Sequence, residues 1–96
     1  MGHDSTRYRI VRIGGQPARY LRRLPRPQQE AIAGAFEYLE QSPLSHPNPT
    51  AIKPLKGKLR GLLRFRVGDL RIVYDVSEER HEISILAIQP RGEIYK

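Results

Sequence analysis

The sequence predicts a single α+β domain over residues 1–96, with the order β-α-α-β-β-β and a helical hairpin on one face of an antiparallel sheet. An apolar stripe with helical spacing in the first half of the chain predicts the helical layer. Runs that alternate between apolar and charged residues in the second half predict the sheet. The length leaves room for one domain, and 39% hydrophobic with 28% charged residues is typical of a globular protein.

The first strand and the first helix are predicted on either side of a glycine pair. Residues 8–13 are rich in β-branched side chains and stop at Gly14, which predicts a strand. Pro17 suits the first turn of a helix, and residues 18–24 form a short basic helix that Pro25 ends.

A second helix is predicted from Pro27 to about Gln41. Its apolar residues fall at positions i, i+3, i+4 and i+7 and form one stripe: Ile32, Ala35, Phe36 and Leu39. Residues 42–54 contain four prolines, so we expect an irregular connection there rather than a domain boundary.

Three further strands are predicted over residues 62–67, 70–76 and 82–88. Gly68 is the first residue of a two-residue loop, which predicts a type II′ hairpin turn between the first two of them. With the helix stripe, the expected core residues of these strands are Phe65, Leu70, Ile72, Ile83, Ile85, Leu86 and Ile88.

The turn sets a register that gathers three arginines on one face of the hairpin. Arg66 falls opposite Arg71, and Arg64 shares their face because side chains at i and i+2 lie on the same side of a strand. Like charges opposite each other cost up to about 1 kcal/mol. A bound polyanion would offset this cost, and a solvated arginine face without a ligand is the alternative.

Positive charge is concentrated around this hairpin. The net charge is +7. The segment from Lys53 to Arg71 contains seven basic residues and one acid, Asp69, which gives this segment a charge of 7 − 1 = +6. Such a patch is typical of a nucleic-acid binder and would also suit an acidic protein partner. The residues expected either to contact the phosphates of a nucleic acid or to be solvated are Lys53, Lys56, Lys58 and Arg60.

Other kinds of site find little support. The histidines His3, His46 and His81 lack the spacing of a metal site, and neither a metal nor a cofactor is expected. The absence of cysteine excludes disulfides. No apolar run is long enough to span a membrane and no signal peptide is visible, so we expect a cytoplasmic protein without membrane contact.

Arginine is a poor proton donor but a strong bidentate ligand for phosphate. Arginines aimed at a phosphate that gains charge in a transition state can carry phosphoryl transfer, at about 2.7–4 kcal/mol per donor. Tyr95 could transfer a proton, stack on a base, or merely pack near the terminus, and its spacing does not distinguish these roles.

Four segments carry a family resemblance: Leu55–Gly57, Leu63–Tyr74, Ile85–Ile88 and Arg91–Tyr95. In these segments the chain resembles the RelE/ParE toxin superfamily, and more narrowly its RelE branch, the toxins of type II toxin–antitoxin modules. RelE-like toxins cut mRNA in the ribosomal A site without a metal. The ribose 2′-hydroxyl attacks the adjacent phosphate and leaves a 2′,3′-cyclic phosphate and a 5′-hydroxyl.

The resemblance therefore implies an endoribonuclease that inhibits translation, has the ribosome and mRNA as partners and is restrained by an acidic, RelB-like antitoxin. The residues that match the catalytic positions of the family are Arg64, Arg66, Arg71, Arg91 and Tyr95. Well-studied members carry lysines in the second-strand pair, one of them a proposed general base. Arginine at 64 and 66 keeps the charge but not an easily shifted pKa, which leaves the identity of the base open.

Two alternatives remain at this point. A ParE-like protein would poison DNA gyrase by binding it, with no chemistry of its own, and would have no need of a phosphate clamp. A plain RNA-binding module would bind with a steep salt dependence but would cut no strand.

Overall fold

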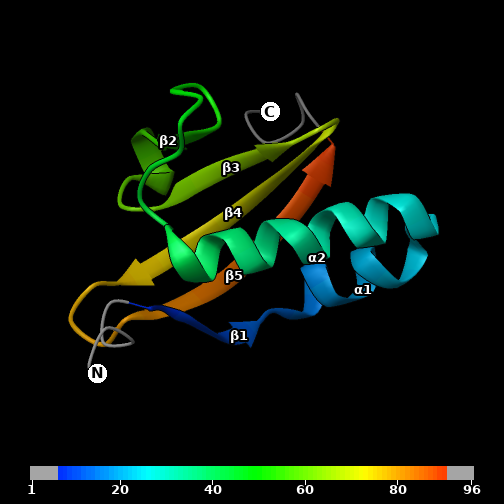
Figure 1. Cartoon of the computed structure of the whole chain (residues 1–96), viewed down its shortest axis with the longest axis horizontal. Coiled ribbons are helices and arrows are strands. Elements are labelled where there is room, and N and C mark those ends of the chain that lie inside the picture. The colour runs from blue at the N-terminus through cyan, green and yellow to red at the C-terminus, as the bar shows by residue number, and fades with distance from the viewer. Residues whose placement is uncertain (1–6, 91–96) are drawn as a thin grey trace.

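The computed structural model describes residues 7–90 and places two helices on one side of a five-stranded sheet (Figure 1). The helices are α1 (Gly15–Arg23) and α2 (Arg26–Gln41), and a short 3-10 helix, η2, covers Gly57–Leu59. The strands are β1 (Arg9–Ile13), β2 (Ile52–Pro54), β3 (Leu63–Val67), β4 (Leu70–Ser77) and β5 (Glu82–Pro90). Their order across the sheet is β1-β5-β4-β3-β2.

The predicted α+β class and helical layer are confirmed, but the expectation of an antiparallel sheet is wrong. β1 pairs with β5 in parallel, which makes the sheet mixed. β2 pairs with β3 inside the segment expected to be irregular. The parallel pairing joins segments distant in sequence, which local turn chemistry does not determine. β2 is also only three residues long and ends in a proline.

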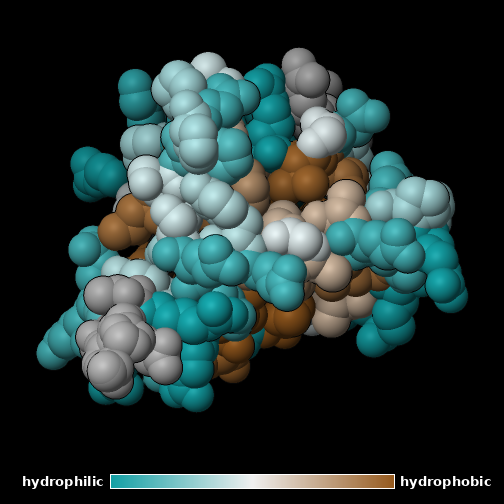
Figure 2. Space-filling view, in the orientation of Figure 1, coloured by the Kyte–Doolittle hydropathy of each residue, from teal (hydrophilic) through white to brown (hydrophobic). Residues whose placement is uncertain are grey.

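The two helices lie close to their predicted positions. Pro17 is in the first turn of α1, as expected, although the helix already begins at Gly15. In α2 the apolar stripe faces the sheet, and Ile32, Ala35 and Leu39 are buried. Figure 2 views this side and shows hydrophilic side chains over most of it, with hydrophobic residues along the seams between helices and sheet.

The main core lies between α2 and the sheet, and six of the seven expected strand residues are buried in it. The exception is Leu86, which is 39% exposed. Along the β4–β5 ladder Val73 pairs with Ala87 and Tyr74 with Ile85, so Leu86 is the extra residue of an irregularity. A bulge of this kind changes which residues face the core, and alternation alone does not reveal it.

Tyr74 connects the core to the loop that follows α2. Its hydroxyl is buried and donates a hydrogen bond to the carbonyl oxygen of Pro43 at 2.7 Å. Burial raises the pKa of Tyr74 well above its ordinary value, and the neighbouring Tyr38 contributes to the rise. The hydroxyl therefore remains a hydrogen-bond donor well into the alkaline range.

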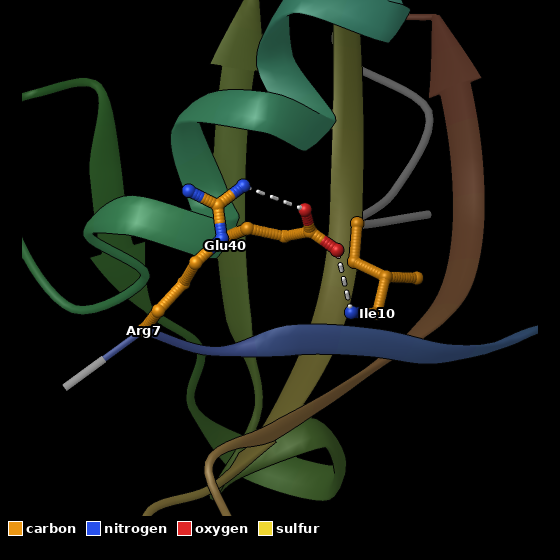
Figure 3. A network of polar contacts seen from close by, with 3 residues as sticks. All are labelled: Arg7, Ile10 and Glu40. Carbon is orange, nitrogen blue, oxygen red and sulfur yellow. Dashed lines mark hydrogen bonds and ion pairs between the residues drawn. The ribbon is translucent and has the colours of Figure 1, made fainter. Parts of the chain in front are cut away.

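Glu40, near the end of α2, covers the outer edge of β1 (Figure 3). Its backbone oxygen accepts from the Tyr8 N–H at 2.8 Å, and its carboxylate accepts from the Ile10 N–H at 3.0 Å. The same carboxylate pairs with Arg7 at 3.3 Å. The Arg9 N–H, between Tyr8 and Ile10, donates instead to the backbone oxygen of His81, on the β5 side. Glu40 therefore binds the N–H groups of this segment that point away from the sheet.

Candidate functional site

The β3–β4 hairpin has the register expected from its turn. Gly68 has a φ of 59°, which matches the first central position of a type II′ turn. Arg66 lies opposite Arg71 and Phe65 opposite Ile72. The predicted juxtaposition of two arginines across the ladder is therefore confirmed.

The arginines lie on the sheet face that points away from the helices. Phe65 packs with Tyr38 and His46 on the helical side, with ring centroids 5.7 Å apart in each case. Arg64 and Arg66, on either side of Phe65 in the strand, therefore belong to the opposite face. Arg71 joins them there as the partner of Arg66. We call the surface formed by Arg64, Arg66 and Arg71 the arginine face.

Arg64 differs from the other two because it is only 7% exposed. Its Nη1 donates to the carbonyl oxygens of Thr50 and Ala51, both at 3.0 Å, which ties β3 to the residues that precede β2. One terminal nitrogen of this guanidinium is thus already engaged with the protein. No motif around Arg64 indicates this attachment, and a catalytic role for Arg64 stays a prediction.

Arg66 and Arg71 are half-buried, and the Nε atoms of both are shielded from solvent. Beside them on the same face lies Val73, which is 4% exposed, does not belong to the main core and pairs with Arg64 and Ala87. An apolar floor beneath guanidinium groups limits water access and strengthens their attraction for an anion. Gln89 lies opposite Arg71 on β5 and was missed by the sequence reasoning.

The basic residues of the preceding segment line one side of this face. All four are exposed: Lys53, Lys56, Lys58 and Arg60. Lys53 on β2 lies directly opposite Arg64 on β3. A hollow of about 240 Å³ is lined by Lys53, Pro54, Leu55, Lys56 and Arg64. Positive charge therefore extends from the arginine face to the β2 edge, and an extended polyanion could follow this path.

The remaining residues singled out from the sequence are two family positions and three histidines. Arg91, Tyr95 and His3 lie outside the described residues. The His46 Nδ1 accepts a hydrogen bond from the Asn48 N–H at 3.0 Å, and the His81 ring lies 4.6 Å from that of Tyr8, so both histidines have structural contacts.

Neither a metal-binding cluster nor a membrane-spanning helix is present in the described residues. Within residues 7–90 there is no group of three or more His, Cys, Asp or Glu side chains placed to hold a metal ion. The same part of the chain contains no helix that is long and apolar enough to cross a membrane.

Comparison with known proteins identifies the family. Residues 16–95 match the model of the ParE toxin of the type II toxin–antitoxin system parDE. The toxin RelE of Mycobacterium tuberculosis is 34% identical over 86 residues, covering 90% of this chain and 84% of that protein.

Solved structures agree with the sequence comparison. The archaeal RelE–RelB complex from Pyrococcus horikoshii has a TM-score of 0.73 at 31% identity and covers 90% of this chain and 97% of that one. The RelBE2 toxin–antitoxin complex of Mycobacterium tuberculosis has a TM-score of 0.75 at 27% identity and covers 88% and 99%, respectively. The chain therefore belongs to the RelE/ParE superfamily of type II toxin–antitoxin toxins.

Proposed function

We propose that this protein is a toxin that cleaves mRNA on the ribosome without a metal and so inhibits translation in the cytoplasm. The observation that carries the proposal is the direct opposition of Arg66 and Arg71 on the sheet face away from the helices, with Arg64 beside them. This arrangement has a cost in the free protein, and a phosphate diester bound between the guanidinium groups offsets it.

In the proposed reaction the 2′-oxygen of a ribose attacks the adjacent phosphorus while the bond from phosphorus to the 5′-oxygen breaks. The 2′-hydroxyl loses a proton, the leaving 5′-oxygen gains one, and a 2′,3′-cyclic phosphate remains. The negative charge on the phosphoryl oxygens is greatest in the transition state between the diester and the cyclic phosphate. Arg66 and Arg71 stabilise that charge, and the Nε atoms of both are shielded from solvent.

The remaining residues have supporting roles in this proposal. Arg64 contributes positive charge at the β2 side, through the part of its guanidinium that does not bind Thr50 and Ala51. Arg91 provides a further phosphate contact, and Tyr95 supplies the proton to the leaving oxygen. The exposed basic residues from Lys53 to Arg60 bind more distant phosphates of the mRNA or of ribosomal RNA.

A cognate acidic antitoxin of the RelB type restrains the toxin. The relative from Pyrococcus horikoshii was solved as a RelE–RelB complex, and that from Mycobacterium tuberculosis as a toxin–antitoxin complex. The helical hairpin has an apolar groove of about 310 Å³ lined mainly by Leu21, Ile32, Ala33 and Phe36. An antitoxin segment that folds on binding would bury this groove, while its acidic residues would neutralise the arginine face.

In vitro translation with mapped mRNA 5′ ends tests the proposal. The wild type should produce new 5′ ends only when ribosomes are present, and Arg66→Ala should lose most of this activity. Arg80→Ala is the matched control, because Arg80 is an exposed arginine in the turn between β4 and β5. An Arg66 variant that cuts as well as the Arg80 variant would refute the role of the arginine face. Binding to RNA without any scission by the wild type would indicate a plain RNA-binding module.

A ParE-like gyrase inhibitor is the second candidate, because the matching family model is that of the ParE toxin. This function predicts intact mRNA and loss of DNA supercoiling by purified gyrase. Assays of both activities with one protein preparation separate the two candidates.

A further inference from the structure

Gln16, in the first turn of α1, makes a two-point contact with the backbone of β5. Its Nε2 donates to the carbonyl oxygen of Ile88 at 3.0 Å, and its Oε1 accepts from the N–H of Ile88 at 3.0 Å. A hydrogen-bonded pair in an antiparallel ladder exchanges the same two bonds. The side-chain amide of Gln16 thus substitutes for a residue of a neighbouring strand.

The position of this contact explains why a substitute is needed there. The last pair between β1 and β5 is Ile13 with Ile85, and β5 continues to Pro90. Beyond Ile85, the edge of β5 on the β1 side has no strand partner within the described residues. Gln16 satisfies the backbone N–H and C=O of Ile88, which would otherwise lack partners in a buried part of the sheet.

The same contact lies next to the arginine face. Ile88 pairs with Ile72 on β4, and the adjacent pair in the ladder is Arg71 with Gln89. Ile88 itself points into the core, with no exposed surface. Fixing its backbone therefore fixes the segment of β5 that carries Gln89 and lies directly beside Arg71.

We infer that Gln16 is a positioning residue, which holds the end of β5 so that Arg71 and Gln89 keep the geometry required for cleavage. The inference rests on the proposed nuclease function for its effect on rate, but not for its effect on β5. A primary amide is required, because only a group with one donor and one acceptor can satisfy both backbone atoms. A displacement of about 1 Å at a catalytic group can lower a rate by about 100-fold.

Gln29 provides a matched control elsewhere in the molecule. Its Nε2 donates to the carbonyl oxygen of Leu21 at 2.7 Å, and this bond joins α1 to α2 instead of α1 to β5. Replacement of either glutamine by methionine keeps the length of the side chain and removes the amide. Gln16→Met and Gln29→Met should therefore both fold and should differ only in which contact they lose.

The experiment combines hydrogen exchange with single-turnover cleavage on programmed ribosomes. In Gln16→Met the exchange of the Ile88 amide should accelerate about tenfold. The maximal cleavage rate should fall at least about tenfold, with the half-saturating toxin concentration changing less than about twofold. Gln29→Met should leave the rate, the half-saturating concentration and Ile88 exchange within about twofold of the wild type.

Two results overturn the inference: Ile88 exchange at the wild-type rate in Gln16→Met, or equal losses of cleavage rate in both variants. The second would mean that loss of the amide acts through general stability. A wild type that cuts no mRNA is a different result. It refutes the proposed nuclease function, and the exchange measurement still decides whether Gln16 holds β5.

Discussion

The two faces of the sheet are formed by the same strands but differ in role, because the helices cover one face and the other carries the arginines. Ile72 is completely buried against the helical layer, and its neighbour Arg71 lies on the arginine face opposite another arginine. Apolar burial on the covered face stabilises the fold, whereas repulsion between like charges on the arginine face destabilises it slightly. Adjacent residues of β4 therefore have different roles: Ile72 stabilises the fold, and Arg71 belongs to the proposed site.

The largest expected effect is on the covered face. Ile72→Ala should lower the free energy of unfolding by about 2–5 kcal/mol, because it removes a fully buried side chain from the centre of the sheet. Chemical denaturation followed by circular dichroism measures this change. Any loss of toxicity should match the loss of folded protein, and a stable but inactive Ile72→Ala variant would break the contrast between the faces.

The corresponding change on the arginine face is Arg71→Ala. It should lower the rate of mRNA cleavage by about 10²–10³-fold, since it removes a cationic donor from the proposed phosphate site. Its effect on the free energy of unfolding should be much smaller than that of Ile72→Ala, because Arg71 is only half-buried. Ribosomal cleavage and denaturation are measured on the same preparation, and wild-type cleavage by this variant would contradict the proposed site.

Tyr74→Phe tests the stability of the covered face through its dependence on pH. Loss of the bond to Pro43 should destabilise the protein by about 1–2 kcal/mol at pH 8 and leave the cleavage rate unchanged. Because the pKa of Tyr74 is raised in the folded state, its contribution is present below the ordinary pKa near 10 and is lost as pH rises above it. The wild type should therefore lose about 1.4 kcal/mol per pH unit more than the variant above pH 10.

Denaturation at pH 8 and pH 11 checks this dependence. The stability difference between the wild type and Tyr74→Phe should shrink or reverse at the higher pH. A constant difference would mean that the Tyr74 hydroxyl ionises equally well in the folded and unfolded chains.

The smallest effect is expected at Glu40. Glu40→Gln removes the ion pair with Arg7, whose side chains are 49% and 27% exposed, and should cost less than about 1 kcal/mol. It retains an oxygen that can accept from Ile10. Glu40→Ala loses that acceptor as well and should cost about 1 kcal/mol more. Thermal unfolding of the two variants separates the contribution of the ion pair from that of the hydrogen bond. Identical unfolding midpoints would mean that the bond with Ile10 does not contribute to stability.

The parts of the fold that local chemistry determines could be predicted from the sequence. The turn at Gly68 set the register, and the register placed Arg66 opposite Arg71. The apolar stripe of α2 likewise followed from helical spacing alone. The parallel pairing of β1 with β5 could not be predicted, because these strands are distant in sequence.

In the site, what escaped prediction were contacts between side chains and remote backbone. Arg64 was expected to share a face with Arg66 and Arg71, and its bonds to Thr50 and Ala51 were not expected, because these partners lie in a segment without a periodic pattern. Gln16 follows two glycines with no motif that would single it out. Such contacts can be recognised only from the three-dimensional structure, which shows where the backbone groups that they bind lie.

The contact of Glu40 with β1 also bears on how the protein behaves when it is concentrated. Exposed strand edges recruit strands from other molecules and so promote aggregation. Here Glu40 already occupies the Tyr8 and Ile10 amides, the docking points such a strand would use. An incoming chain would have to displace a helix end and a charged side chain, so this half of the edge resists uncontrolled fibre-like growth.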